Sequence, residues 1–215
     1  IVQANVKIWP NKELETGVSL NESLIWGGRA HRSLFGAYGI SGLVNVDITP
    51  EFAARLGAAY GATLPKGATV TINRDPHRSP RMIKRAMISG LPSAGANVLD
   101  IQSVPIPVAR FVTRATHAAG GIHVRISPFD DRLVEIKFFD DQGMDLDKTA
   151  ERKIENTFFR EDFRRVYLDE IGSIVVDEQT AEAYDAAFIK ALDVESIRRA
   201  SFRVVIDYAH GSSSM

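Results

Sequence analysis

Apolar residues recur along most of this chain at helical spacing and, between the helical stretches, at every second position. The pattern predicts helices over residues 50–61, 79–90, 108–120, 147–159 and 180–192, and strands over residues 70–72, 97–101, 122–126, 134–138 and 202–206. Thr49 and Ser79 each precede a proline, which is typical of the start of a helix. Alternating strands and helices predict the α/β class, with a layered mixed β-sheet and flanking helices, in which strand 134–138 runs antiparallel to strand 122–126.

The first 30 residues follow a different period. Aliphatic or aromatic residues recur there at intervals of six: Val2, Ile8, Leu14, Leu20 and Trp26. A six-residue period is typical of hexapeptide-repeat left-handed β-helices, in which each hexad forms one face of a triangular coil. Because these hexads make fewer than two coils, we expect residues 1–30 to be the last turns of a longer β-helix. The alternative is an amphipathic coil or a pair of strands that meets this period by chance.

Charge and composition narrow the functional class. The 215 residues carry 26 basic and 27 acidic side chains that are interspersed, so neither a basic nucleic-acid surface nor an acidic tail is predicted. No apolar run approaches the ~18 residues of a membrane span, and the absence of cysteine excludes disulfides and thiolate metal sites. The histidines lack the spacing of zinc ligands. We expect a cytoplasmic protein without nucleic-acid or membrane partners, and homo-oligomerisation stays open.

A serine marks the point where the predicted strand 122–126 ends. Residues 121–139 read GIHVRISPFDDRLVEIKFF, with Ser127 before a Pro/Asp turn and a second strand directly after it. This segment resembles the phosphoserine loop of the α-D-phosphohexomutases (phosphomannomutase and phosphoglucomutase), whose signature T-A-S-H-N-P lies between a Gly-Ile-apolar strand and a G-I-K-F-F-like strand. In an ungapped comparison the family serine falls on Ser127. The signature's threonine becomes Arg125, and its His-Asn-Pro becomes residues 128–130.

Further motifs extend the resemblance in the same order along the chain. Residues 35–42 (FGAYGISG) look like the family's opening F-G-T-D-G-I-R-G, with the glycines kept and the Thr, Asp and Arg changed. Residues 74–77 (RDPH) are similar to the R-D-T-R loop, and residues 105–107 (PIP) to P-T-P. Residues 202–212 resemble the strand and glycine-rich turn that begin the family's second domain. The resemblance therefore implies domain I over residues 34–162 and the start of domain II over residues 175–215.

The resemblance implies an intramolecular phosphotransferase. In the family a phosphorylated serine donates its phosphoryl group to a mannose or glucose 1- or 6-phosphate and receives one back, while magnesium offsets charge at the transferring oxygens. Ser127 is then the catalytic residue, a hexose phosphate the substrate and magnesium the cofactor. The family's metal loop and its sugar- and phosphate-contacting loops would lie beyond Met215, so we expect residues 1–215 alone to be inactive.

Cationic residues accompany the predicted catalytic serine. Because a strand has a period of two, His123, Arg125 and Ser127 should project from one face. An arginine can contact phosphate oxygens through two nitrogen atoms, whereas the family's threonine offers only a hydroxyl. We expect a phosphate-binding patch at the exposed tip of a tight bend. The candidate phosphate- or substrate-binding residues are Arg125, His123, Arg74, His77 and Arg78.

The same residues also allow a purely structural interpretation. His123 and Arg125 would then lie on a solvated strand face, paired with Lys137 and Glu135 across the hairpin. In that case Ser127 and Pro128 form an ordinary turn. The sequence is compatible with both interpretations.

Two functions follow for the whole protein. In the first, it is a sugar-phosphate enzyme in which a phosphohexomutase module is fused to a nucleotidyltransferase of the mannose-1-phosphate guanylyltransferase type, because hexapeptide repeats commonly follow such domains. In the second, the mutase module is degenerate and acts as a sugar-phosphate-binding, regulatory or oligomerisation domain. The loss of the family's Thr, His and Asn around the serine favours the second function.

Overall fold

A six-stranded mixed sheet forms the centre of the structure, a computed structural model that describes residues 1–8, 13–14, 16–20, 29–30, 33–161, 163–177 and 179–207. The strands are β1 (Glu13–Leu14), β2 (Arg29–Ala30), β3 (Ile40–Leu43), β4 (Thr69–Arg74), β5 (Asn97–Asp100), β6 (Gly120–Ile126), β7 (Leu133–Phe139) and β8 (Ile174–Val176). The helices are α1 (Pro50–Thr63), α2 (Arg78–Ser93), α3 (Ile106–Ala115), α4 (Lys148–Arg160), α5 (Thr180–Lys190) and α6 (Val194–Ala200), with a short 3-10 helix at Leu168–Glu170.

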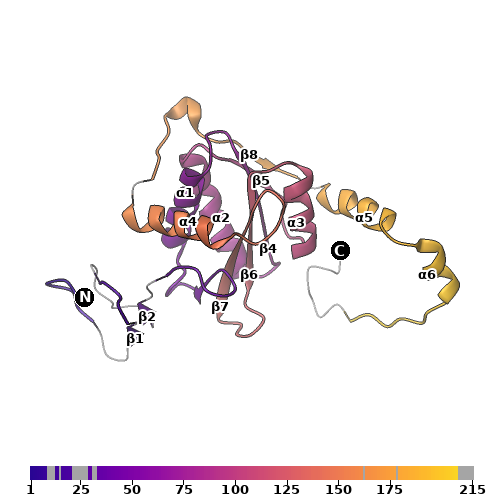
Figure 1. The fold of residues 1–215 in the computed structure, drawn as a ribbon, viewed down its shortest axis with the longest axis horizontal. Coiled ribbons are helices and arrows are strands. Elements are labelled where there is room, and N and C mark those ends of the chain that lie inside the picture. Colours follow the sequence, from indigo (N-terminus) through magenta and orange to yellow (C-terminus); the bar gives the residue numbers. More distant parts are fainter. Residues whose placement is uncertain are drawn as a thin grey trace.

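The strand order in this sheet is β3-β7-β6-β4-β5-β8. Strand β4 runs parallel to β5 and β6, and β7 runs antiparallel to β6, as predicted. Helix α2 packs on β4, β5 and β6, with α1 beside it and α4 against α1, whereas α3 lies on the opposite face with α5 against it (Figure 1). The predicted class, a layered mixed sheet with flanking helices, is confirmed.

Of the two N-caps predicted from the sequence, Thr49 and Ser79, the structure confirms one. Thr49 caps α1, because its Oγ1 accepts a hydrogen bond of 3.2 Å from the backbone N–H of Phe52, as predicted. The predicted cap at Ser79 is wrong, because α2 begins at Arg78 and its N-cap is His77, whose backbone is extended. Pro80 then lies within the first turn, where the N–H it lacks would have no partner in the helix.

Two other element boundaries also differ from the prediction. Helix α3 ends at Ala115, and Gly120 and Gly121 are the first residues of β6. A Cβ at Gly121 would lie 2.6 Å from the Thr113 hydroxyl on α3, so a glycine lets the strand and the helix approach each other closely. Residues 202–206 form no strand, because they have no neighbouring strand in the described structure, and Val205 is fully exposed.

Both faces of the sheet are covered by apolar packing. The larger core cluster lies between the sheet and α1, α2 and α4, and it includes Leu56, Ile72, Ile83, Met87 and Leu91. A smaller cluster beneath α3 contains Ile101, Val104, Val108, Ala109, Val112 and Phe139. On the face that α3 covers, the polar side chains His123 of β6 and Glu135 of β7 are buried, and Arg125 and Lys137 are half-buried.

The N-terminal residues pair in parallel. Val2 forms an isolated parallel bridge with Leu20, three six-residue intervals later, and β1 pairs in parallel with β2. Trp26 and the predicted junction at residues 27–28 lie outside the described residues. The hexapeptide β-helix therefore stays a prediction.

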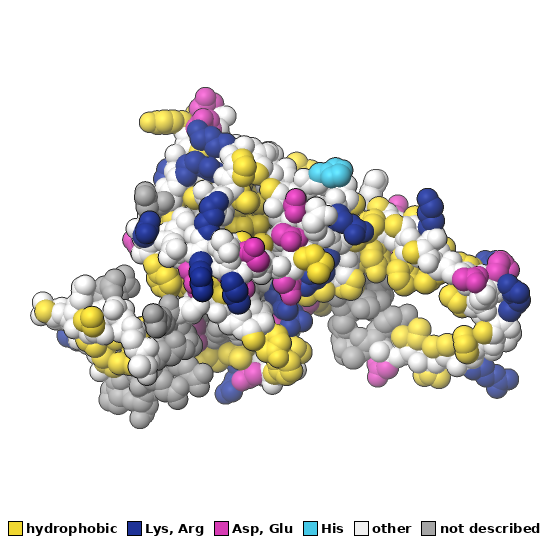
Figure 2. Space-filling model, in the orientation of Figure 1, with side chains coloured by type: hydrophobic (Ala, Val, Ile, Leu, Met, Phe, Trp, Pro, Cys, Tyr) yellow, Lys and Arg dark blue, Asp and Glu magenta, His cyan; other side chains and the backbone are white. Residues whose placement is uncertain are grey.

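The C-terminal part of the chain first adds a strand to the sheet and then leads away from it. Strand β8 pairs in parallel with β5, so the sheet extends past residue 162, and α5 packs on α3 through the rings of Tyr184 and Phe111 at 5.5 Å. Beyond that contact, exposed apolar side chains such as Phe188, Ile197 and Phe202 follow α5, α6 and the chain after them (Figure 2). Residues 208–215 lie outside the described residues, and the start of a second domain stays a prediction. None of the described helices is both long and apolar enough to cross a membrane.

Candidate functional site

Ser127 directly follows β6, at the carboxyl end of the sheet, and its side chain turns inward. The residue is 6% exposed. Its hydroxyl donates a hydrogen bond of 2.7 Å to Oε1 of Glu135 on β7. The expected exposed position of this serine is therefore wrong, because a buried carboxylate on the neighbouring strand holds the hydroxyl inside the hairpin.

Arg125 binds the other oxygen of the same carboxylate. Its Nε donates to Oε2 of Glu135 at 2.8 Å, and its Nη2 lies 2.7 Å from that atom. The Glu135 side chain is 2% exposed and that of Arg125 is 22% exposed. The cross-strand pairing of the structural interpretation is present, but it is buried rather than solvated. Arg125 and Ser127 do share a face of β6, as the period of two predicts.

His123 lies on the same face, two positions before Arg125, and it is neutral. Its Nδ1 is 3.0 Å from Oδ1 of Asn73, whose amide nitrogen donates to the Val104 carbonyl, so the ring nitrogen is the donor. Burial, with the positive charges of Arg125 and Lys137, lowers the pKa of His123 to about 3. His123 thus contributes no positive charge to a phosphate patch at neutral pH.

Asp75 connects the loop before α2 to the end of β6. Its backbone N–H donates to the Val124 carbonyl at 2.9 Å, and its Oδ2 accepts from the Ile126 N–H at 3.2 Å. Burial raises the pKa of Asp75. Its Oδ1 is 3.7 Å from Nε2 of His123, too far for a hydrogen bond, and with a neutral ring the two groups form no ion pair.

The structure separates Arg74 from His123, Arg125 and Ser127, the predicted site residues in and directly after β6. Arg74 adjoins Asn73 in β4, and neighbouring strand residues point to opposite faces. Arg74 therefore faces α2, near Asp100, while Ser127 and Arg125 face the α3 side. His77 and Arg78 are exposed at the start of α2. The single patch expected from the sequence is thus divided between the two faces of the sheet.

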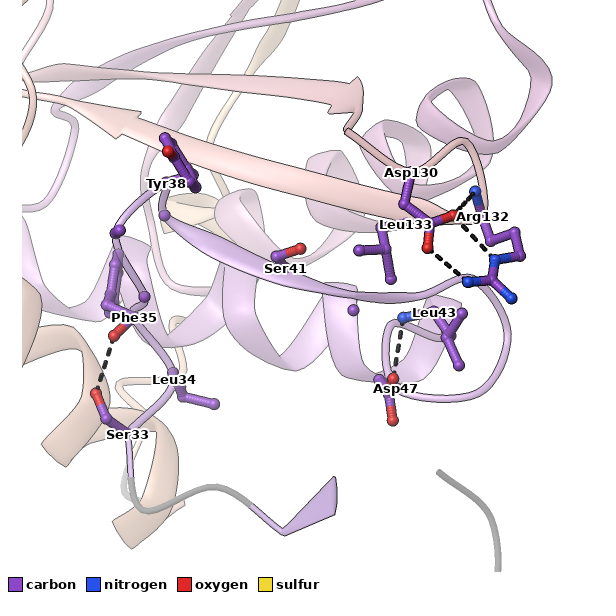
Figure 3. A pocket seen from close by; sticks show the side chains of 14 residues that line it. Ser33, Leu34, Phe35, Tyr38, Ser41, Leu43, Asp47, Asp130, Arg132 and Leu133 are labelled. Carbon is purple, nitrogen blue, oxygen red and sulfur yellow. Dashed lines mark hydrogen bonds and ion pairs between the residues drawn. The ribbon is translucent and has the colours of Figure 1, made fainter. Parts of the chain in front are cut away.

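A pocket of about 620 Å³ lies beside the glycine-rich segment 35–42. Figure 3 shows Tyr38 at one end and the ion pair of Asp130 with Arg132 at the other. Neither Ser127 nor Arg125 lines this pocket, and Arg132, the one arginine among the described lining residues, is already bound by Asp130 through two hydrogen bonds. The pocket is therefore not a continuation of the serine site.

The described side chains do not fit a resident metal. They contain no group of three histidine or acidic residues that could hold an ion. Glu135, the carboxylate beside the serine, already binds Ser127 and Arg125 through both oxygens. Both carboxylate oxygens beside Ser127 are thus engaged within the chain and are not free to bind magnesium.

Fold and site together define an α/β domain with a serine at the carboxyl edge of a mixed sheet. Residues 32–165 match the family described as "Phosphoglucomutase/phosphomannomutase, alpha/beta/alpha domain I". The chain belongs to this family, as its motifs predicted.

Curated relatives and solved structures agree with this assignment. The chain is 36% identical over 186 residues to "Phosphoglucomutase/phosphomannomutase" of Thermococcus kodakarensis, covering 85% of this chain and 41% of that protein. It is 32% identical over 183 residues to "Phosphoglucosamine mutase" of Nautilia profundicola, covering 84% and 41%. A phosphoglucomutase/phosphomannomutase family protein of Burkholderia thailandensis shares the fold, with a TM-score of 0.64 at 22% identity over 75% of this chain and 36% of that one. The chain thus spans about two fifths of the length of these curated relatives.

Sequence reasoning missed the central role of Glu135. The signal was present, because the ungapped comparison that places the family serine on Ser127 also places the glycine of the G-I-K-F-F-like strand on Glu135. A glycine there leaves the space beside the serine free, whereas this chain fills it with a carboxylate. The substitutions at Arg125 and Glu135 belong together, because each neutralises the other.

Proposed function

We propose that this chain is a phosphohexomutase domain I in which Ser127 has lost phosphoryl transfer, and that it serves as a non-catalytic module of a larger sugar-phosphate enzyme. The observation that supports this proposal is the hydrogen bond of 2.7 Å between the Ser127 hydroxyl and the buried carboxylate of Glu135. A serine held in this way does not present its oxygen to a substrate. Arg125 beside it is paired with Glu135 and is not free to bind a phosphate.

Electrostatics also support this proposal, because a phosphoserine in this position would meet the Glu135 carboxylate. A phosphoserine carries about −1.5 to −2 charges at neutral pH. Two unit charges 4 Å apart repel by about 4 kcal/mol at an effective dielectric constant of about 20. Arg125 can offset one negative charge, and it is already paired with Glu135. Phosphorylation of Ser127 would therefore add uncompensated negative charge beside a side chain that is 2% exposed.

The larger protein that we propose combines this module with a sugar-phosphate nucleotidyltransferase of the mannose-1-phosphate guanylyltransferase type. The six-residue period of the first 30 residues supports this proposal, and so does the parallel bridge between Val2 and Leu20. In that protein the module binds a sugar phosphate, regulates the enzyme or mediates oligomerisation.

Family membership favours a second candidate, an active phosphohexomutase with magnesium and a hexose phosphate as substrate. The relatives that carry mutase names match 84% or more of this chain. In this alternative, the segment after β6 opens, Ser127 leaves Glu135, and Arg125 transfers to the phosphoryl oxygens.

A coupled mutase assay on the full-length protein tests the proposal. We expect no turnover of mannose 1-phosphate or glucose 1-phosphate above the buffer rate, and no change on Ser127→Ala. Ser89→Ala, at an exposed position on α2, is the matched control. Turnover that disappears in Ser127→Ala and persists in Ser89→Ala would refute the proposal and establish the active mutase.

A further inference from the structure

Four cationic side chains gather where β4 and β5 end, on the face of the sheet opposite Ser127. Arg74 is the last residue of β4, and Arg81, Lys84 and Arg85 belong to the first half of α2. Lys84 is buried, and its Nζ donates to both carboxylate oxygens of Asp100, at 2.5 and 2.7 Å. Lys84 and Asp100 therefore neutralise each other, and the three arginines are left to be balanced by something else.

Arg74 is a nearly enclosed cation without a carboxylate partner. The residue is 8% exposed, and its guanidinium donates a hydrogen bond of 2.7 Å to the Asp75 carbonyl. Within the described part of the chain no carboxylate lies within ion-pair distance of it. Burial lowers the pKa of Arg74, and the positive charges of Arg81 and Arg85 lower it further, while the carboxylates of Asp100 and Asp75 partly oppose this shift. A cation in such surroundings is stabilised when an anion is bound beside it.

Helix α2 adds positive potential at the same place. Positions 81 and 85 lie on one face of the helix, because residues four apart are neighbours on its surface. Both arginines are exposed, and their guanidinium groups bond no residue of the described structure. The helix starts without a side-chain cap from His77 and has no acidic residue in its first turn. No acidic side chain of its own first turn therefore offsets the partial positive charge at this helix end.

We propose that Arg74, Arg81 and Arg85 form an oxyanion-binding site that takes a phosphoryl group at the carboxyl edge of β4. Arginine suits this ligand, because its planar guanidinium can donate two parallel hydrogen bonds to phosphate oxygens. The facing carboxylates are engaged, Asp100 with Lys84 and Asp75 with the Ile126 N–H. The phosphoryl group comes either from a hexose phosphate or from free phosphate.

This site is separate from the loop that follows β6. It involves neither the Ser127 hydroxyl nor the carboxylate of Glu135. The inference therefore holds whether or not Ser127 carries phosphate, and its failure would leave the proposed function untouched.

Isothermal titration calorimetry on the full-length protein tests the site with three probes: inorganic phosphate, glucose 6-phosphate and uncharged glucose. We expect both phosphates to bind and glucose not to bind. In the double variant Arg81→Gln/Arg85→Gln, affinity should fall by at least about tenfold, because two charge-assisted contacts are lost. Equal affinities for inorganic phosphate and glucose 6-phosphate would show that the site recognises the phosphoryl group alone. Much tighter binding of glucose 6-phosphate would show that the ligand is a sugar phosphate.

The control is the double variant Arg152→Gln/Arg160→Gln, which removes two exposed arginines of α4 and the same net charge. It should retain the affinity of the wild type. Absence of phosphate binding in the wild type, or equal losses in the two double variants, would overturn the proposal. The double variant of α2 changes exposed side chains only, so its circular dichroism and thermal transition should match those of the wild type, and a loss of fold would be visible separately. If the α2 double variant does not fold, the single variants Arg85→Gln and Arg152→Gln are compared instead. We expect Arg85→Gln to weaken phosphate binding and Arg152→Gln to leave it unchanged.

Discussion

Ser127 and Glu135 face each other across the hairpin of β6 and β7, with the serine Oγ 2.7 Å from Oε1 of the glutamate. The second oxygen of this carboxylate is occupied by Arg125. The three side chains satisfy one another, so the loop that carries phosphate in a phosphohexomutase is closed here by the protein's own groups. Substituting one of these side chains should therefore lower the free energy of unfolding, and the loss should be larger when the remaining partner is more deeply buried.

Removing either charge of the pair should cost unequal amounts of stability. Arg125→Gln leaves the Glu135 carboxylate, 2% exposed, without its counter-ion, and should lower the free energy of unfolding by about 3–5 kcal/mol. Glu135→Gln leaves Arg125, 22% exposed, which water can partly solvate, and should cost about 2 kcal/mol. Urea denaturation of the two single variants measures both values.

The double variant Arg125→Gln/Glu135→Gln provides the control for this pair. It removes both charges together, so it should lose less stability than the sum of the two single variants. Additive losses would show that the pair is not coupled and would contradict the geometry.

Stability at acidic pH should depend on His123. Its pKa is about 3 in the fold and near the ordinary value of 6.5 in the unfolded chain. Between these values the unfolded state binds the additional proton, so this residue makes the protein less stable as pH falls from 6.5 toward 3. His123→Asn should flatten the pH dependence by up to about 1.4 kcal/mol per pH unit in this window.

The exposed His117 offers the matched comparison for this experiment. Asp75, whose raised pKa acts in the opposite direction, is present in all three proteins. His117→Asn should leave the slope of the wild type unchanged, and an equal flattening in both variants would show that His123 is not the responsible group.

Gly39 should tolerate alanine poorly, because it lies directly before β3 and against the backbone of β7. It has a φ of +93°, and a Cβ there would collide with the Ile136 carbonyl oxygen. Gly67, with a φ of +75°, has open space around it. We expect Gly67→Ala to cost about 1–2 kcal/mol through the backbone alone, and Gly39→Ala to cost clearly more. Equal midpoints of thermal unfolding for the two variants would contradict the close approach.

The features that the sequence predicts best are those set by neighbouring residues. The Thr49 cap depends on adjacent residues and the shared face of Ile122 and Val124 on a period of two, and both are present in the structure. The family motif is also a local signal, and it correctly placed Ser127 directly after a strand.

The features that the sequence does not predict depend on distant partners. Lys84 has the spacing of an exposed helical residue, but Asp100, which reaches it from β5, makes burial favourable. The inward turn of Ser127 depends on Glu135, which reaches it across the hairpin from β7. Neither partner can be located by periodicity, because each belongs to another element.

Intact-protein mass spectrometry tests the central claim most directly. The full-length protein is incubated with glucose 1,6-bisphosphate and magnesium, and its mass is compared with that of Ser127→Ala treated in the same way. Because Glu135 holds the Ser127 hydroxyl and adds a buried negative charge beside it, we predict that neither protein gains the mass of one phosphoryl group. A stoichiometric gain in the wild type that is absent in Ser127→Ala would contradict the account.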